Sequence, residues 1–139
     1  MVKRKPKQGV DYAIKITNYD LFVYPSQTGN PPVVAVMTLK GDADTETAPS
    51  TPAGIAFYIN FHPDSSDGVG PPVVEPNPLR VNMDMFYYQL EGLVDALNNA
   101  LLNSGPDCYV GYQDSPVHGY FGTSAAAPTK GRRTVTPKR

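Results

Sequence analysis

Three side chains of this 139-residue chain have the types that nucleophilic catalysis uses: Cys108, His62 and His118. A cysteine attacks as the thiolate, and a nearby histidine or a helix N-terminus is needed to lower its pKa. Cys108 instead follows a Gly-Pro-Asp turn at the start of a predicted strand, where a free cysteine is more often a small core residue. We therefore predict that the three do not lie within the ~2.6–3.2 Å of one another that proton transfer requires.

A metal site would have to combine His62, Asp64 and Asp67 from one loop, with His118 as a further ligand. The run DSSDG at 64–68 is similar to the start of a calcium loop, but the alternating carboxylates and distal glutamate of such loops are missing. A single cysteine excludes an internal disulfide and a zinc site built from several cysteines of one chain. We expect no metal, no cofactor, no small-molecule substrate and no enzymatic activity.

The formal net charge is only −1, but the charges are segregated along the chain. Between the two ends, Lys15, Lys40 and Arg80 stand against all thirteen carboxylates, a net charge of −10. The other nine lysines and arginines form a block of positive charge at each end of the chain. Such blocks often bind polyanions, so we predict that the two ends bind nucleic acid. The alternatives are that they only solubilise the chain or fold back onto its acidic body. The predicted nucleic-acid-binding residues are Lys3, Arg4, Lys5, Lys7, Lys130, Arg132, Arg133, Lys138 and Arg139.

The aromatic residues are a second lead, because most of the nine tyrosines and five phenylalanines fall on predicted strands or at the start of the predicted helix. Exposed sheet aromatics beside positive charge form stacking platforms for single-stranded nucleic acids. Tyrosines also suit a core or a subunit interface. The confident strands carry only Lys15 and Lys40, and an acidic body repels phosphate, which favours the core or interface. The stacking or interface candidates are Tyr58, Tyr109, Tyr112 and Tyr120.

The elements that must position these residues follow from hydropathy periodicity. Strands are predicted over 10–24, 33–40 and 54–62, with a short one at 79–83, an edge strand at most at 73–74, and a hairpin of 108–112 with 117–121. One helix is predicted by the apolar stripe from Phe86 to Leu101. Its start would be capped by Asn82 or Asp84, its end would be set by the Gly-Pro pair at 105–106, and Gly92 would make a close packing contact.

This order predicts an α+β fold in which an antiparallel sheet of about five to six strands is covered on one face by one long amphipathic helix. There are too few helical crossovers for a parallel sheet. We expect a basic N-terminal tail over 1–9, a single α+β domain over 10–123, and a linker with a basic C-terminal tail over 124–139. The predicted core comprises Ile14, Phe57, Ile59, Leu90, Leu93 and Leu97.

No window holds the ~18–20 apolar residues of a membrane span. The basic start is followed by polar residues, unlike a secretory signal. We therefore expect a cytoplasmic protein without a membrane partner, or a virion-associated one if the source is a phage.

Three runs carry a resemblance: IAFYINFHPD at 55–64, YYQLEGLVDALN at 87–98 and CYVGY at 108–112. They loosely resemble small bacterial and phage proteins of unknown function. The order of several strands and then a helix is also similar to the Whirly and transcriptional-coactivator fold of single-stranded-DNA-binding proteins. That resemblance implies a curved sheet with a helix that supports dimers. The chain departs from this fold in lacking basic residues on the sheet and in having a hairpin after the helix.

We interpret the chain as a small, self-associating, non-enzymatic module, a homo-oligomer whose basic tails bind nucleic acid electrostatically with little sequence preference. The alternative is a structural or assembly protein, such as a phage or particle component, whose tails dock on acidic surfaces of neighbouring subunits.

Overall fold

The structure is a computed structural model that describes residues 10–28, 33–64, 69–114 and 116–123. The nine predicted nucleic-acid-binding residues of the two tails lie outside these ranges, as does Asp67. The elements in chain order are β1 (Val10–Thr28), β2 (Val33–Ala43), β3 (Ala56–His62), β4 (Val73–Glu75), β5 (Arg80–Phe86), the 3-10 turn η1 (Tyr87–Gln89), α1 (Leu90–Leu102), β6 (Tyr109–Asp114) and β7 (Val117–Gly122).

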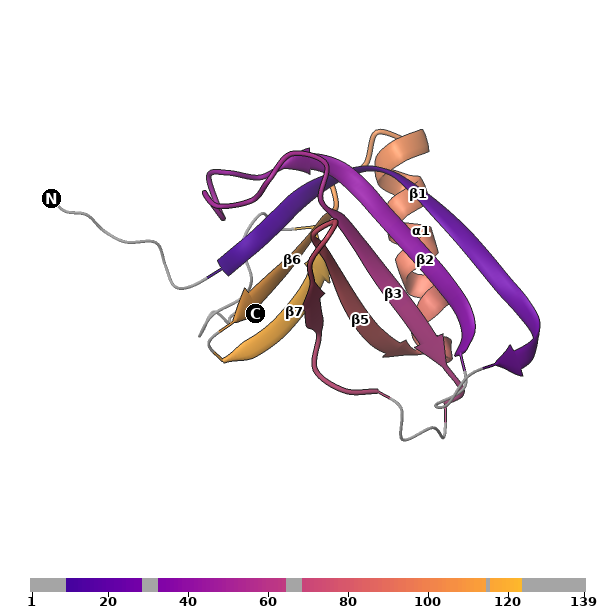
Figure 1. The fold of residues 1–139 in the computed structure, drawn as a ribbon. Coiled ribbons are helices and arrows are strands. Elements are labelled where there is room, and N and C mark those ends of the chain that lie inside the picture. The colour runs from indigo at the N-terminus through magenta and orange to yellow at the C-terminus, as the bar shows by residue number, and fades with distance from the viewer. Residues whose placement is uncertain (1–9, 29–32, 65–68, 115, 124–139) are drawn as a thin grey trace, which may run out of the picture.

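The strands form a single curled sheet of seven in the order β4-β5-β3-β2-β1-β6-β7 (Figure 1). All neighbours are antiparallel except β3 and β5, which run parallel from Ala56 opposite Arg80 to His62 opposite Phe86. The fold mixes helix and sheet, as the α+β prediction requires. The expected antiparallel sheet of five to six strands under one long helix is wrong in strand number, in strand direction and in helix length.

The reason for the parallel pair lies in the stretch between β3 and β5. Parallel neighbours need a crossover long enough to carry the chain back, and this crossover is usually a helix. Here the proline- and glycine-rich stretch 63–79 carries the chain back instead, and within it β4 pairs antiparallel with β5 at the edge of the sheet. The prediction of an edge strand at 73–74 is thereby confirmed.

β1 is by far the longest strand and changes neighbours along its length. Its first part pairs with β6, from Val10 opposite Gln113 to Lys15 opposite Tyr109, while β2 pairs with it from Ile14 onward. A register shift between Ile16 and Asn18 marks a bulge, which bends the strand. The polar residues after Ile16 continue the strand beyond this bulge.

The helix begins later than the periodicity predicts. Asn82 and Asp84 do not cap it, because both lie in β5, whose backbone is engaged with β3 as far as Phe86. The chain then makes the η1 turn, in which the Phe86 N–H donates to Gln89 Oε1 at 3.0 Å, and α1 starts at Leu90. Gly92 has open space around it, so the expected close contact there is wrong.

The end of the helix is near the predicted place but uses a different residue. Asn103 is the C-cap, and Ser104, with φ of 60°, takes the left-handed conformation expected of Gly105. The Gly105 N–H donates to Asn99 O at 2.8 Å, and a Cβ at Gly105 would collide with the Asn99 side chain. Gly105 is thus needed for close approach rather than for its backbone dihedral angles.

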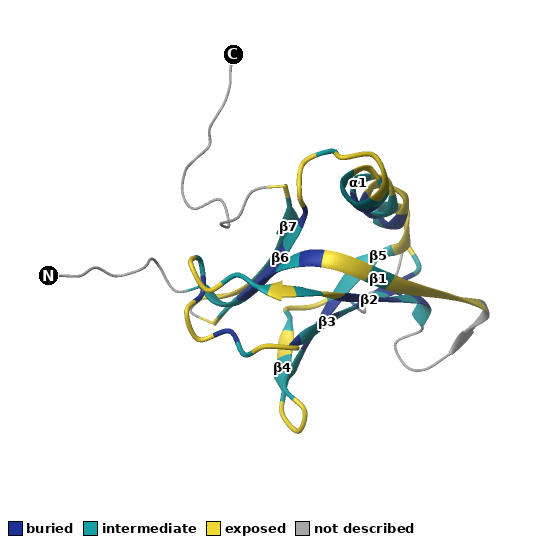
Figure 2. Cartoon of the chain, turned by 90° about the horizontal axis from the view of Figure 1, so that it is seen from above, coloured by how far each residue is buried: buried dark blue, intermediate teal, exposed yellow. Residues whose placement is uncertain are grey.

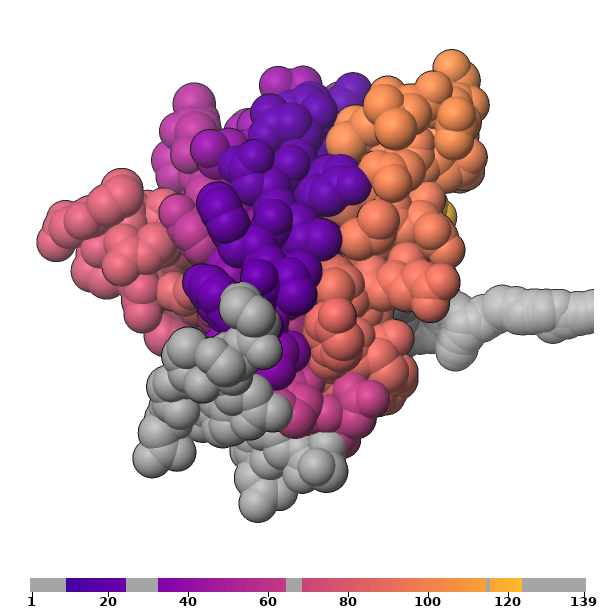
Figure 3. All heavy atoms as spheres, turned by 90° about the vertical axis from the view of Figure 1, so that its right-hand side faces the viewer, coloured from indigo at the N-terminus to yellow at the C-terminus, as the bar shows by residue number. Residues whose placement is uncertain are grey.

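The core lies between the sheet and α1, which packs against one face of the sheet beside β1 (Figures 2 and 3). Every residue predicted for the core is buried. The Tyr19 hydroxyl on β1 donates to Asn98 Oδ1 on α1 at 2.7 Å, which adds a polar tie between strand and helix. No helix in the described part of the chain is long and apolar enough to cross a membrane.

Candidate functional site

The structure gives each residue of the hypothetical catalytic set a different partner. His62 is buried at the end of β3, and its Nε2 lies 2.7 Å from Asp84 Oδ1 on the neighbouring β5. Cys108 is also buried, and its thiol donates to Ala96 O on α1 at 3.4 Å. His118 lies exposed on β7, opposite Gln113.

The environment of Cys108 disfavours the thiolate. Burial, with a further contribution from the neighbouring Asp107 carboxylate, raises the pKa of the Cys108 thiol. A thiol with a raised pKa is a weak nucleophile at neutral pH, because little of it is ionised. Its position therefore fits the small core residue that the sequence predicts.

Two of the residues that a metal site would have to combine, His62 and Asp64, bind other residues of the chain. Asp64 Oδ1 accepts a hydrogen bond from the Tyr88 N–H at 2.9 Å and so ties the end of β3 to η1. No group of three or more His, Cys, Asp or Glu side chains among the described residues is placed to hold a metal ion.

The four candidate tyrosines have different environments. Tyr58 and Tyr109 are half-buried on β3 and β6. Tyr112 is buried, its ring stacks on Tyr12 with centroids 6.2 Å apart, and its hydroxyl donates to Asp114 Oδ1 at 3.0 Å. A base-stacking or interface role for these residues stays a prediction.

Tyr120 is the fourth of these tyrosines, and its ring packs over Gly111, where a Cβ would collide with it. Its buried hydroxyl has no hydrogen-bond partner among the described residues. Burial, followed by the nearby Asp44 carboxylate, raises the pKa of Tyr120 to about 12. The ring is therefore part of the packing between β6 and β7.

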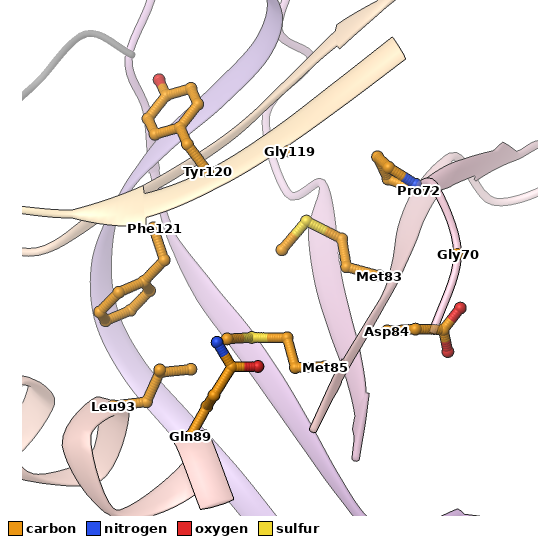
Figure 4. A pocket seen from close by; sticks show the side chains of 10 residues that line it. All are labelled: Gly70, Pro72, Met83, Asp84, Met85, Gln89, Leu93, Gly119, Tyr120 and Phe121. Carbon is orange, nitrogen blue, oxygen red and sulfur yellow. The ribbon is translucent and has the colours of Figure 1, made fainter. Parts of the chain in front are cut away.

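A cavity of about 440 Å³ opens between β5, β7 and α1. Most of the side chains that point into it are apolar, and they include Met83, Met85, Leu93 and Phe121 (Figure 4). Gln89 and Asp84 are polar side chains of the lining, and Asp84 Oδ1 lies 2.7 Å from His62 Nε2, while the Tyr120 hydroxyl points away from the cavity.

The free edge of β1 is the surface feature that stands out. Beyond Ile16, whose N–H donates to Cys108 O at 2.9 Å, β2 is the one described strand that pairs with β1. In Figure 3 this edge faces the viewer, and no other described segment lies over it. We use "free edge" below for residues 18–24, whose last four side chains are apolar and 36–61% exposed: Leu21, Phe22, Val23 and Tyr24.

Exposure on both faces is the unusual property of these four residues. A strand normally alternates buried and exposed side chains, and β1 does so over residues 14–16, where Ile14 and Ile16 are buried and Lys15 is half-buried. The sequence signal for the difference is the uninterrupted run LFVY, which lacks any alternation of apolar and polar residues. Sequence analysis placed this run on a strand but did not single it out as a site.

A groove of about 290 Å³ adjoins the end of the free edge. Val23, Tyr24 and Tyr87 are among the residues that line it, together with Pro63 and Asp64 at the end of β3. Beside it, Tyr87 and Tyr88 are exposed, and the Tyr88 ring stacks on Phe86 with centroids 5.8 Å apart. The free edge is thus continuous with further exposed aromatic surface.

Cations are few on the folded body. Lys15, Lys40 and Arg80 are the only lysines or arginines within the described ranges, and Arg80 is paired with Glu75 at 2.8 Å. The exposed side of α1 adds Glu91 and Asp95 to an already acidic surface.

No protein family, curated protein or solved structure matches the chain.

Proposed function

We propose that the chain is a non-enzymatic, self-associating module whose basic tails bind nucleic acid electrostatically with little sequence preference. The observation that carries this proposal is the separation of positive charge from the sheet. The folded body offers phosphate only three cations, one of them already paired with Glu75, while nine cations lie in the tails. Since phosphate contacts supply most non-specific affinity, the tails are the part of the chain suited to a polyanion.

Self-association has its own support in the free edge. Four adjacent exposed apolar residues on a strand whose outer edge has no partner among the described strands make a surface that soluble proteins usually cover or protect. Association would also bring several pairs of basic tails together on one particle, which raises the affinity for a long polyanion.

The test is the salt dependence of binding to a single-stranded oligonucleotide. If the tails make about 4–7 phosphate contacts, the slope of log K on log salt should be about −3 to −6. Replacement of Lys3, Arg4, Lys5 and Lys7 with Ser should flatten this slope by up to about 4 and leave the melting temperature nearly unchanged.

The control variant keeps the charge and changes the side chains. Substitution of Lys3, Lys5 and Lys7 with Arg should preserve the slope, because counterion release depends on charge rather than on the identity of the cation. A slope that is the same for the Ser variant and the wild type would contradict a role of the N-terminal tail.

A second function is favoured by the acidity of the body. Thirteen carboxylates against three cations over 10–123 offer the tails of neighbouring copies a surface of opposite charge, as in a structural or assembly protein. In that case the Ser variant should form fewer oligomers than the wild type in analytical ultracentrifugation without nucleic acid. High salt should dissociate the wild-type oligomers.

A further inference from the structure

We propose that two copies of this chain pair antiparallel through the free edge of β1, about a two-fold axis at Phe22. This inference rests on the self-association in the proposed function and names its surface and its partner. The paired strands would join the two sheets into one continuous sheet.

The first argument is the unmet hydrogen-bonding capacity of the edge. In an edge strand every second residue directs its N–H and C=O groups away from the sheet, and these groups template pairing with another strand. Natural edges are protected by lysines, prolines, bulges or short length. Residues 18–24 contain no lysine and no proline, and the two register shifts of β1 flank the regularly paired stretch 18–23, one between Ile16 and Asn18 and one between Val23 and Thr28, where Pro25 lies.

The second argument is the place of the apolar run within the unpaired part of β1. The outer edge of this part begins beyond Ile16 and is free of proline up to Pro25, and Phe22 lies at the centre of its segment 20–24. A two-fold axis there places Leu21, Phe22 and Val23 opposite the same three residues of the second copy and uses the same patch on both chains, as a closed dimer requires. A peptide of another sequence would have no such self-complementarity.

The third argument is the match of side chains across the axis. Phe22 would lie opposite Phe22, and Leu21 would lie opposite Val23, so that apolar residues face one another. Asp20, the only charged residue of the free edge, would lie opposite Tyr24 rather than opposite another carboxylate. This register therefore places no like charges directly opposite one another.

The groove fits the same arrangement. Val23 and Tyr24 line it, so the second copy's Leu21, opposite Val23, would lie at its mouth. The exposed side of α1 offers a poorer surface for a second copy, since Glu91 and Asp95 on both helices would repel each other.

The test uses a matched pair of substitutions. Val23 on the free edge and Val73 on β4 are equally exposed, at 54%. In analytical ultracentrifugation of the full chain, free of nucleic acid and at high salt, we expect a wild-type dimer. Val23→Lys should raise the dimer dissociation constant at least about tenfold, whereas Val73→Lys should leave it unchanged. High salt weakens contacts between basic tails and acidic bodies, so a dimer that survives it does not depend on the tails.

A cysteine scan tests the register without relying on a destabilising charge. Residues directly opposite across an antiparallel pair have Cα atoms ~4.5–5.5 Å apart, within the range of a disulfide. Phe22→Cys should therefore cross-link to itself under oxidation. Leu21→Cys and Val23→Cys should cross-link when mixed and much less alone. Cys108 is fully buried, so the wild type provides the uncross-linked baseline.

The outcomes separate the two proposals. A wild-type chain that stays monomeric at every concentration overturns self-association and strand pairing together. A dimer that Val23→Lys does not weaken, and in which Phe22→Cys does not cross-link, overturns strand pairing alone and assigns self-association to another surface.

Discussion

Tyr120 shows how a single side chain can be fixed by packing while its polar atom is left without a partner. Its ring occupies the space that Gly111 leaves open, and its hydroxyl is buried without a partner among the described residues. The buried hydroxyl makes ionisation costly, which is why the pKa of Tyr120 is raised to about 12.

This shift predicts a loss of stability in alkali. An unfolded tyrosine ionises near its ordinary pKa of about 10, whereas the folded Tyr120 keeps its proton up to about 12. The unfolded state therefore releases its proton first, and stability that is fully present below pH 10 falls as the pH rises toward 12. Between pH 8 and pH 11, the urea concentration at the midpoint of unfolding should fall less for Tyr120→Phe than for the wild type. Tyr88→Phe, at an exposed position, should behave as the wild type.

Cys108 and the four candidate tyrosines show how far the environment of a single residue could be predicted from the sequence. Cys108 was predicted to be a small core residue because of its place before a strand, and it is one. The environments of the four candidate tyrosines could not be predicted, because alternation along a strand does not say what covers each face. Tyr112 is buried and Tyr58 half-buried although both alternate with apolar neighbours.

At the scale of elements, the spacing of apolar residues predicted the helix correctly, but the predicted start and capping residues of the helix were wrong. Leu90, Leu93 and Leu97 are buried as the stripe predicts. Phe86 fits the same stripe, but β5 continues through it because its backbone pairs with His62 on β3. Local sequence also carries no sign of strand direction, so the parallel β3–β5 pair follows only from the path of stretch 63–79.

The buried side of α1 should dominate its stability. Leu97 is fully buried, while Leu102 in the last turn is 74% exposed. Leu97→Ala should lower the free energy of unfolding by about 2–5 kcal/mol, because it removes apolar contacts and leaves a cavity. Leu102→Ala, the matched control on the same helix, should change it by less than about 0.5 kcal/mol. Equal midpoints for the two variants in urea denaturation would contradict the assigned face of the helix.

Two glycines should respond to alanine in opposite directions. Gly92 lies within α1 with open space around it, so Gly92→Ala should stabilise the protein by about 0.5–1 kcal/mol through lower backbone entropy of the unfolded chain. Gly41 on β2 faces the bulge of β1, where a Cβ would collide with the Lys15 carbonyl. Gly41→Ala should therefore destabilise the protein, and thermal melts of both variants give the comparison.

At the scale of the whole molecule, the chain separates two kinds of surface. Nine of its twelve lysines and arginines lie in the tails, which sequence analysis identified from the blocks of Lys and Arg alone. The run of exposed apolar residues 21–24 lies on the free edge, which the sequence placed on a strand without showing that no described strand covers it. Which part of β1 is paired on this side depends on where β6 begins, at Tyr109, and no local pattern encodes that.

If the two surfaces act together, a substitution on the free edge should weaken nucleic-acid binding without touching a tail. A dimer carries twice as many tails as a monomer. A long single-stranded oligonucleotide that reaches the tails of both copies should therefore bind the dimer more tightly than it binds a monomer. Val23→Lys should therefore lower the affinity for a long oligonucleotide more than for a short one that reaches a single copy's tails. The added lysine would by itself favour phosphate, which makes a loss of affinity all the more informative. Val73→Lys adds the same charge on β4 and should keep the wild-type difference between long and short strands. Fluorescence anisotropy, at protein concentrations above and below the dimer dissociation constant, measures the affinities for the long and the short oligonucleotide. If Val23→Lys and Val73→Lys changed both affinities equally, nucleic-acid binding would not depend on self-association.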